Sequence, residues 1–192
     1  MKIRVAVPAD APAMGRVMVD SFLSAHRGQL PDAAWQQRAD EWTPEVSARG
    51  WARALTAHAE GNAARDVVLV AEDDVGVLSA LVSGTAADDD PSGSTAEIGA
   101  LYVLPDRRGQ GFGGSLLRAA AGALADRGFT SLHLVVLTAN LPARAFYEAM
   151  GGREIGQQEV EEEGHLLPGT VYGWPDITVL SDRGCGHGVR RG

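Results

Sequence analysis

Four glycines stand within six residues of the segment Leu101–Ala120, between an apolar run and a helical pattern. The apolar run ends at Pro105, and two arginines precede the first glycine. Glycine lacks a Cβ atom and tolerates left-handed backbone, so this density indicates that another group lies against the main chain. The segment predicts a strand, a tight loop and a helix in direct succession, with the loop at the helix N-terminus.

The patterns on either side of this unit predict one domain of the α/β (α+β) class. Apolar alternation and β-branched runs indicate strands, and apolar residues three or four apart indicate helices. We expect strands over residues 2–7, 67–71, 77–83, 96–104, 131–137, 153–162 and 170–180. We expect helices over residues 11–26, 113–127 and 142–150, and one or two more over 33–58. The domain then covers residues 1–180, and residues 181–192, which carry no apolar pattern, are expected to form a flexible tail.

Composition and charge exclude several classes of function. The 192 residues carry a net charge of −8 and only one lysine, Lys2, which argues against a nucleic-acid partner. No apolar stretch approaches the roughly 18–20 residues of a membrane span, and the first residues lack the apolar core of a signal peptide. Cys185 is the only cysteine, so a disulfide framework is excluded. We expect a cytoplasmic protein with no metal, no membrane association and no nucleic acid.

Three kinds of phosphate-binding loop compete for the glycine segment. A P-loop needs a lysine at the helix start, and the chain has none beyond Lys2, so this alternative is excluded. Gly109, Gly111 and Gly114 satisfy the G-x-G-x-x-G pattern of dinucleotide-binding folds. That pattern also needs an acidic residue after the next strand and a doubly wound sheet. Residues 137–140 contain no acid, and a hairpin precedes the unit, so the dinucleotide alternative is disfavoured.

The third pattern includes the arginine. Residues 108–113 fit R/Q-x-x-G-x-G/A after a strand ending in V-x-P, which resembles the acyl-CoA-binding signature of the GNAT superfamily of N-acetyltransferases. Asn140–Glu154 is similar to the family's N-x-x-A-x-x-F-Y-x-x-x-G-F segment, with Gly152 where an aromatic residue is usual. The resemblance spans about residues 2–180. It implies a GNAT-like three-layer fold, with a mixed, mostly antiparallel sheet of about six or seven strands, helices on both faces and a splayed central strand pair.

The resemblance implies acetyl-CoA (coenzyme A) as the cofactor. A helix N-terminus offers unpaired N–H groups and partial positive charge, which suit a pyrophosphate. The strand before the loop would bulge and give main-chain contacts to the pantetheine arm, and Asn140 would either bind its amide or only cap the next helix. The residues expected to bind the cofactor are Leu101, Tyr102, Val103, Arg108, Gly109, Gln110, Gly111, Phe112, Gly113, Gly114, Asn140 and Tyr147.

Two residues are candidates for catalysis. Tyr147 matches the tyrosine that protonates the departing thiolate in the family, and a pKa near 10 suits that task; the alternative is a core tyrosine. Glu97, eleven residues before Arg108, lies where histone-type members place the glutamate that deprotonates the amine. The alternative for Glu97 is a solvated carboxylate. The glutamate position of ribosomal-protein acetylating members is Val135 here, so that version is absent.

The acceptor site is expected between residues 24–32 and 161–169. The resemblance implies transfer of an acetyl group from acetyl-CoA to a primary amine of a small molecule, by direct attack in a ternary complex. The alternatives are a peptide N-terminus or lysine as acceptor, and a non-catalytic acyl-CoA sensor. The sequence leaves the oligomeric state open, with a homodimer as one alternative. Residues that could line the acceptor site are His26, Arg27, His165, Glu161, Glu162 and Glu163, although a run of glutamates is more typical of a solvated turn.

Overall fold

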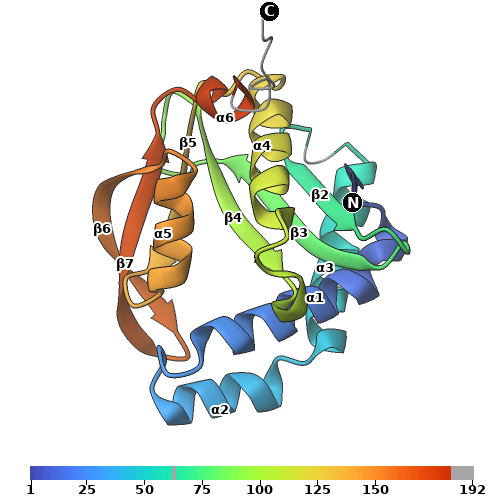
Figure 1. Cartoon of the computed structure of the whole chain (residues 1–192), viewed down its shortest axis with the longest axis vertical. Coiled ribbons are helices and arrows are strands. Elements are labelled where there is room, and N and C mark those ends of the chain that lie inside the picture. Colours follow the sequence, from blue (N-terminus) through green and yellow to red (C-terminus); the bar gives the residue numbers. More distant parts are fainter. Residues whose placement is uncertain (62–63, 183–192) are drawn as a thin grey trace, which may run out of the picture.

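The computed structural model describes residues 1–61 and 64–182, and a seven-stranded sheet forms its centre (Figure 1). The strands lie in the order β1-β2-β3-β4-β5-β7-β6. Their bounds are β1 Lys2–Val5, β2 Val67–Glu72, β3 Leu78–Ala86, β4 Thr95–Val103, β5 Ser131–Leu137, β6 Arg153–Glu162 and β7 His165–Trp174. The α-helices are α1 Ala11–His26, α2 Asp32–Glu41, α3 Pro44–Ala59, α4 Phe112–Ala125, α5 Leu141–Ala149 and α6 Thr178–Asp182, and two 3-10 turns are η1 Pro8–Asp10 and η2 Pro105–Arg107.

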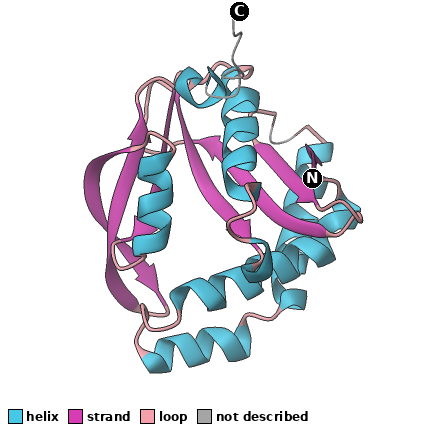
Figure 2. Cartoon of the chain, viewed as in Figure 1, coloured by secondary structure: helices cyan, strands magenta, loops and turns pink. Residues whose placement is uncertain are grey.

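The sheet and its helices form three layers. Neighbouring strands are antiparallel except β4 and β5, which are parallel. Helices α1 and α3 pack on one face, while α4 and α5 cover the other (Figure 2). These observations confirm the predicted mixed, mostly antiparallel sheet with helices on both faces.

Helix α4 is held on the sheet by one apolar stripe. Its buried residues recur at intervals of one, three and four, which places them on a single helix face. Each buried leucine contributes about 1.5–3 kcal/mol by leaving water. The stripe packs against Val82 and Ile98 of the sheet, so the start of α4 is fixed relative to β3 and β4. The stripe consists of Leu116, Leu117, Ala120, Ala121 and Leu124.

A bulge and a separation interrupt the centre of the sheet. Ser83 of β3 pairs with Ala100 while the next residue, Gly84, pairs with Ile98, so Gly99 of β4 has no partner on β3. Strand β5 pairs with β4 only along Thr95–Glu97. Beyond these residues the two strands diverge (Figure 1), which confirms the predicted splayed pair. The extra residue of a bulge also bends a strand and changes which face its later side chains occupy.

The end of the chain differs from the prediction. Strand β7 begins at His165, five residues earlier than expected, and ends at Trp174 rather than continuing to residue 180. Pro175 follows, and Asp176 Oδ1 accepts a hydrogen bond from the Thr178 backbone N–H at 2.9 Å, which starts α6. Helix α6 includes residues 181 and 182 of the expected tail. The rest of that tail, with Cys185, lies outside the described residues.

Two absences concern the described residues 1–61 and 64–182. None of their helices combines the length and apolar character needed to cross a membrane. None of their His, Cys, Asp or Glu side chains form a group of three or more that could hold a metal ion.

Candidate active site

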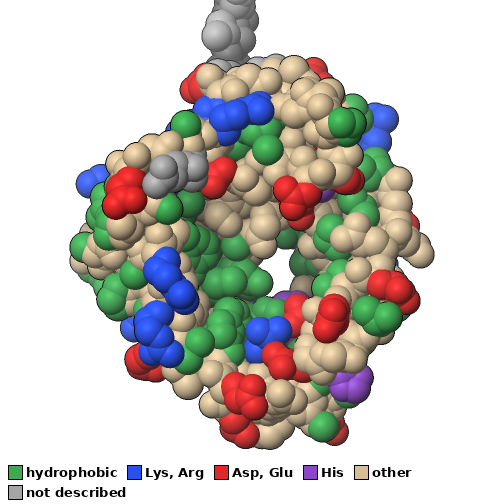
Figure 3. Space-filling view, turned by 180° about the vertical axis from the view of Figure 1, so that it is seen from behind, with side chains coloured by type: hydrophobic (Ala, Val, Ile, Leu, Met, Phe, Trp, Pro, Cys, Tyr) green, Lys and Arg blue, Asp and Glu red, His purple; other side chains and the backbone are tan. Residues whose placement is uncertain are grey.

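A cavity of about 970 Å³ occupies the gap between the diverging parts of β4 and β5. Its walls come from the last turns of α1, the glycine loop, the first turns of α4, and α5 with the end of β6. Seen from behind, the molecule is hollowed at its centre, with apolar side chains around the hollow (Figure 3). The cavity therefore connects the loop to the region where the acceptor site is expected.

The cavity brings together most of the residues that the sequence predicted. Gln110 and Glu97 are the two exceptions, since neither is among the lining residues. Gln110 instead donates from Nε2 to the Asp106 carbonyl oxygen at 2.9 Å. The predicted residues that do line the cavity are Leu101, Tyr102, Val103, Arg108, Gly109, Gly111, Phe112, Gly113, Gly114, Asn140 and Tyr147.

The glycine loop forms an open cradle at the start of α4. Gly109 and Gly111 have φ angles of 73° and 87°, a left-handed conformation that side chains disfavour. A Cβ at either position would meet no atom within 4 Å, so the space beside the loop is free for a ligand. The first helical hydrogen bond is Ser115 N–H to Gly111 O, which leaves the preceding N–H groups of α4 unpaired. Together with the helix dipole, these groups make an anion site.

Arg118 is a cavity residue that the sequence reasoning missed. It lies one turn after Gly114 on α4 and lines the same cavity. Its Nε atom is buried with no hydrogen-bond partner in the described part of the chain. The signal was available, because residues four apart share a helix face. Arg118 can therefore add charge to the anion site formed by the loop.

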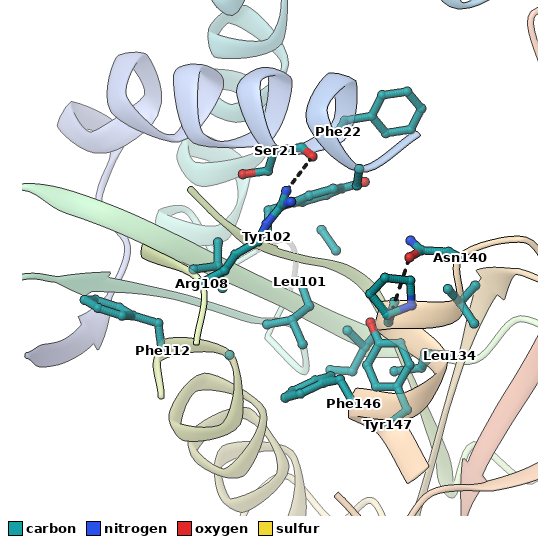
Figure 4. Close-up of a pocket in the computed structure, with 18 of the residues that line it drawn as sticks. Ser21, Phe22, Leu101, Tyr102, Arg108, Phe112, Leu134, Asn140, Phe146 and Tyr147 are labelled. Atoms are coloured by element: carbon teal, nitrogen blue, oxygen red, sulfur yellow. Dashed lines mark hydrogen bonds between the residues drawn. The ribbon is translucent and has the colours of Figure 1, made fainter. Parts of the chain in front are cut away.

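Tyr147 is buried beside the gap in the sheet. Its side chain packs against Phe146, Tyr172 and Trp174, with ring centroids 5.2, 5.9 and 6.4 Å away. Its hydroxyl points into the cavity (Figure 4). Burial raises the pKa of Tyr147 above its ordinary value, and the nearby Tyr102 raises it further. The hydroxyl is therefore protonated at neutral pH.

Asn140 caps α5 and also lines the cavity. Its Oδ1 accepts a hydrogen bond from the Ala143 backbone N–H at 3.3 Å, so the capping alternative is realised. The cap fixes where α5 begins, and Tyr147 lies two helical turns later on the same side. Asn140 Nδ2 makes no hydrogen bond within residues 1–61 and 64–182, so it can still donate to a ligand.

The backbone of β4 faces the gap after the bulge. The Leu104 N–H donates to Ser79 O of β3 at 3.0 Å. Backbone groups alternate along a strand, so the N–H and C=O groups of Val103 and Leu101 point the other way, toward β5. Strand β5 no longer pairs with β4 at this level. An extended ligand can therefore bind these backbone groups as an added strand does.

The expected acceptor region is formed by α1, α2 and the β6–β7 hairpin. His26 and Glu162 line the cavity there, whereas Arg27, His165, Glu161 and Glu163 are not among the lining residues. Arg38 of α2 binds Glu162 and Glu163, at 2.5 and 2.7 Å, and so connects α2 to the β6–β7 hairpin. Two of the three consecutive glutamates are thus paired with Arg38 rather than solvated.

Glu97 lies in the part of β4 that still pairs with β5. Its partner in the register is His133, and His133 Nε2 lies 3.7 Å from Glu97 Oε2. The Glu97 side chain is 36% exposed. Since both residues are outside the cavity lining, the structure does not bring Glu97 together with Tyr147.

Known proteins resemble this chain in sequence and in fold. It is 32% identical to the Uncharacterized N-acetyltransferase YuaI of Bacillus subtilis over 113 residues, which is 59% of this chain and 65% of YuaI. The chain thus spans slightly less than two thirds of that relative. PaiA N-acetyltransferase from Thermoplasma acidophilum, solved in complex with coenzyme A, has a TM-score of 0.68 at 16% identity, with 90% of this chain and 96% of that chain covered.

A second solved structure and a family profile agree. YncA from Salmonella typhimurium, a putative acetyltransferase solved with its cofactor acetyl-CoA, has a TM-score of 0.65 at 20% identity, over 92% of this chain and 94% of that one. At such identities the structures show a shared fold. The profile of the Acetyltransferase (GNAT) family matches residues 29–152, which include β4, the glycine loop, α4 and α5. This chain is therefore a member of the GNAT acetyltransferase family.

Proposed function

We propose that the protein transfers an acetyl group from acetyl-CoA to a primary amine of a small molecule. One observation carries the proposal: a single cavity joins the cradle at the start of α4 to the buried Tyr147 through the gap between β4 and β5. That path has an anion site at one end, unpaired strand backbone in the middle and a protonated hydroxyl beside it. These are the groups that coenzyme A and its thioester require.

The described residues fit coenzyme A in order along the cavity. The N–H groups at the start of α4 would hold the pyrophosphate, and the unpaired Arg118 would add charge to its phosphates. The main chain of Leu101 and Val103 would pair with the pantetheine amides. The Asn140 Nδ2 group faces the same stretch of cavity and would donate to the pantetheine from the other side.

The chemistry follows from groups beside the thioester. A backbone N–H of β4 would polarise the acetyl carbonyl and stabilise the charge that develops on its oxygen. Tyr147 would give its proton to the thiolate as the C–S bond breaks. Burial disfavours the tyrosinate, and it would also disfavour a thiolate in the same cavity. The amine would attack the thioester directly in a ternary complex, without a covalent enzyme intermediate.

The connection between α2 and the β6–β7 hairpin favours a small acceptor. Arg38 bridges α2 to the β6–β7 hairpin through Glu162 and Glu163, so a protein chain has less room to enter there. Glu97 stays the sequence-based candidate for the base. Its place beside His133, outside the cavity lining, means that it would act through water.

The decisive experiment combines binding and turnover. Calorimetry with coenzyme A should give saturable binding, and thiol release from acetyl-CoA should depend on an added amine from a panel of small amines and short peptides. Binding without turnover for any amine or peptide would favour an acyl-CoA sensor instead. Absence of coenzyme A binding would refute the proposed function, and turnover only with peptides would reassign the acceptor.

A further inference from the structure

His26 is placed to act on the acceptor. It lies at the end of α1 and lines the cavity. Its Nδ1 atom is 2.9 Å from the Phe22 carbonyl oxygen, and its ring stacks on the Phe22 ring with centroids 4.1 Å apart. A carbonyl oxygen can only accept, so Nδ1 carries the proton of the neutral ring. The lone pair is therefore on Nε2, the nitrogen that remains for a ligand.

Glu162 lines the same cavity as His26. It is the last residue of β6. Its Oε2 atom is held by Arg38, and its Oε1 atom makes no hydrogen bond in the part of the chain that the structure describes. The carboxylate is thus oriented by one oxygen and can accept from a ligand with the other.

From this arrangement we propose that His26 and Glu162 form the acceptor-amine subsite, in which Glu162 receives the ammonium group and His26 Nε2 removes its proton. The proposal rests on the proposed acetyltransferase function and deepens it. One ammonium proton passes to His26, and the resulting amine forms the C–N bond to the acetyl carbon. The C–S bond breaks, the sulfur takes the Tyr147 proton, and the second amine proton returns to Tyr147 through water.

The charges around His26 agree with this role. Burial is the main influence and lowers the pKa of His26, so the ring is neutral at pH 7 and can accept a proton. The charged groups facing it are Glu162 of β6, Arg38 of α2 and Arg108 of the loop; Glu162 raises the pKa and the two arginines lower it. Arg38 also lies over the Phe22 ring, 5.4 Å from its centroid, so this contact connects α2 to α1.

The other walls indicate which amines fit. Phe22 and Leu137 are buried in an apolar cluster that Tyr102 and Val160 join, and all four residues line the cavity. The substrate class is therefore a primary amine attached to an apolar or aromatic body. Burying such a body adds favourable free energy that a short hydroxylated amine lacks.

The test compares pH profiles with phenethylamine as the probe. In the wild type, kcat/KM should stay constant with pH at pH values above the lowered pKa of His26. In His26→Gln it should fall at least 100-fold at pH 7 and then rise tenfold per pH unit toward the pKa of the amine, about 10. His58→Gln, a matched change on α3 outside the cavity, should keep the wild-type profile. Calorimetric affinity for coenzyme A should be unchanged in both variants, which shows that the fold persists.

Each other outcome has a definite meaning. A His26→Gln profile that matches the wild type would overturn the role of His26, and a rising profile found only in Glu97→Gln would give that role to Glu97. Glu162→Gln should raise the KM for phenethylamine about tenfold with a smaller change in kcat, and an unchanged KM would remove Glu162 from the subsite. Phenethylamine should exceed ethanolamine in kcat/KM at least tenfold; equal values would overturn the apolar substrate class. A wild type that binds coenzyme A but acetylates no amine would overturn the proposed function itself.

Discussion

Arg108 donates from Nη2 to the carbonyl oxygen of Ser21, 3.1 Å away, and so fastens the glycine loop to α1 (Figure 4). Its Nη1 atom also reaches Ser24 Oγ at 3.4 Å. Burial lowers the pKa of Arg108, and no carboxylate pairs with it among the described residues. The residue that opens the loop therefore also positions the helix that carries His26.

We expect Arg108→Gln to weaken this connection. A hydrogen bond from a charged group is worth about 1.5–3 kcal/mol, and the partial exposure of Arg108 lowers the loss below this range because solvent screens the charge. Urea unfolding should show a decrease of about 1 kcal/mol, with a raised KM for the amine. If Arg108 only binds phosphate, coenzyme A affinity will fall while the free energy of unfolding stays constant.

Tyr147→Phe should separate chemistry from binding. The variant keeps the ring that packs against Trp174 but loses the proton that the thiolate needs, so kcat should fall 100-fold or more. Calorimetric affinity for coenzyme A should change less than threefold. The matched control is Tyr172→Phe, which removes a hydroxyl bound to Glu148 and Arg144 outside the cavity and should lower stability rather than kcat. An unchanged kcat in Tyr147→Phe would remove the proton-donor role.

The same substitution should have opposite effects at two glycines near one helix. Gly111→Ala forces a side chain into a left-handed conformation at the N-cap of α4, at a cost of about 1–2 kcal/mol, and places a methyl group in the cradle. Affinity for coenzyme A should fall more than tenfold. Gly122→Ala lies within α4, in open space, and should stabilise the protein by about 0.5–1 kcal/mol. Thermal unfolding and calorimetry on both variants check this, and equal effects would contradict the cradle.

Alkaline pH should destabilise the fold through its buried tyrosines. Burial raises the pKa of Tyr102 to about 12, whereas an exposed tyrosine in the unfolded chain ionises near 10. Because the folded value is the higher one, the stabilising contribution is complete below pH 10 and is lost between pH 10 and about 12. Such a group gives a slope of up to about 1.4 kcal/mol per pH unit. Urea unfolding of Tyr102→Phe should show a shallower decline above pH 10 than the wild type, and parallel declines would refute the assignment.

The sequence predicted the end of the cavity at the glycine loop better than the end at α1 and the β6–β7 hairpin. The glycine loop and the segment from Asn140 to Tyr147 are local patterns, and local backbone geometry follows from them. His26 and Glu162 are 136 positions apart in the sequence (162 − 26), and they line the same cavity because of how α1 and the β6–β7 hairpin are placed. No periodicity in either segment specifies that placement.

Two features of the fold have a signal in the sequence itself. Gly99 sits inside a strand pattern, which is typical of a bulge, and the register of β4 against β3 shifts at this residue. Ile177 and Leu180 are buried three residues apart, which is a helical spacing, whereas the sequence pattern predicts a strand there. In both places the backbone geometry changes within a short apolar run, and the apolar pattern alone does not mark the position of the change.

Only three residue pairs join the two halves of the sheet, those of Thr95–Glu97 with Ser131–His133. A ligand that lies along β4 as an added strand would form the backbone hydrogen bonds that β5 does not form there. It would therefore stabilise the sheet as well as react. Ligand at 100 times its dissociation constant stabilises a fold by about 2.7 kcal/mol. Amide hydrogen exchange along both β4 and β5 would then slow when that ligand is added, and the rigidity of the sheet would depend on whether the ligand is bound.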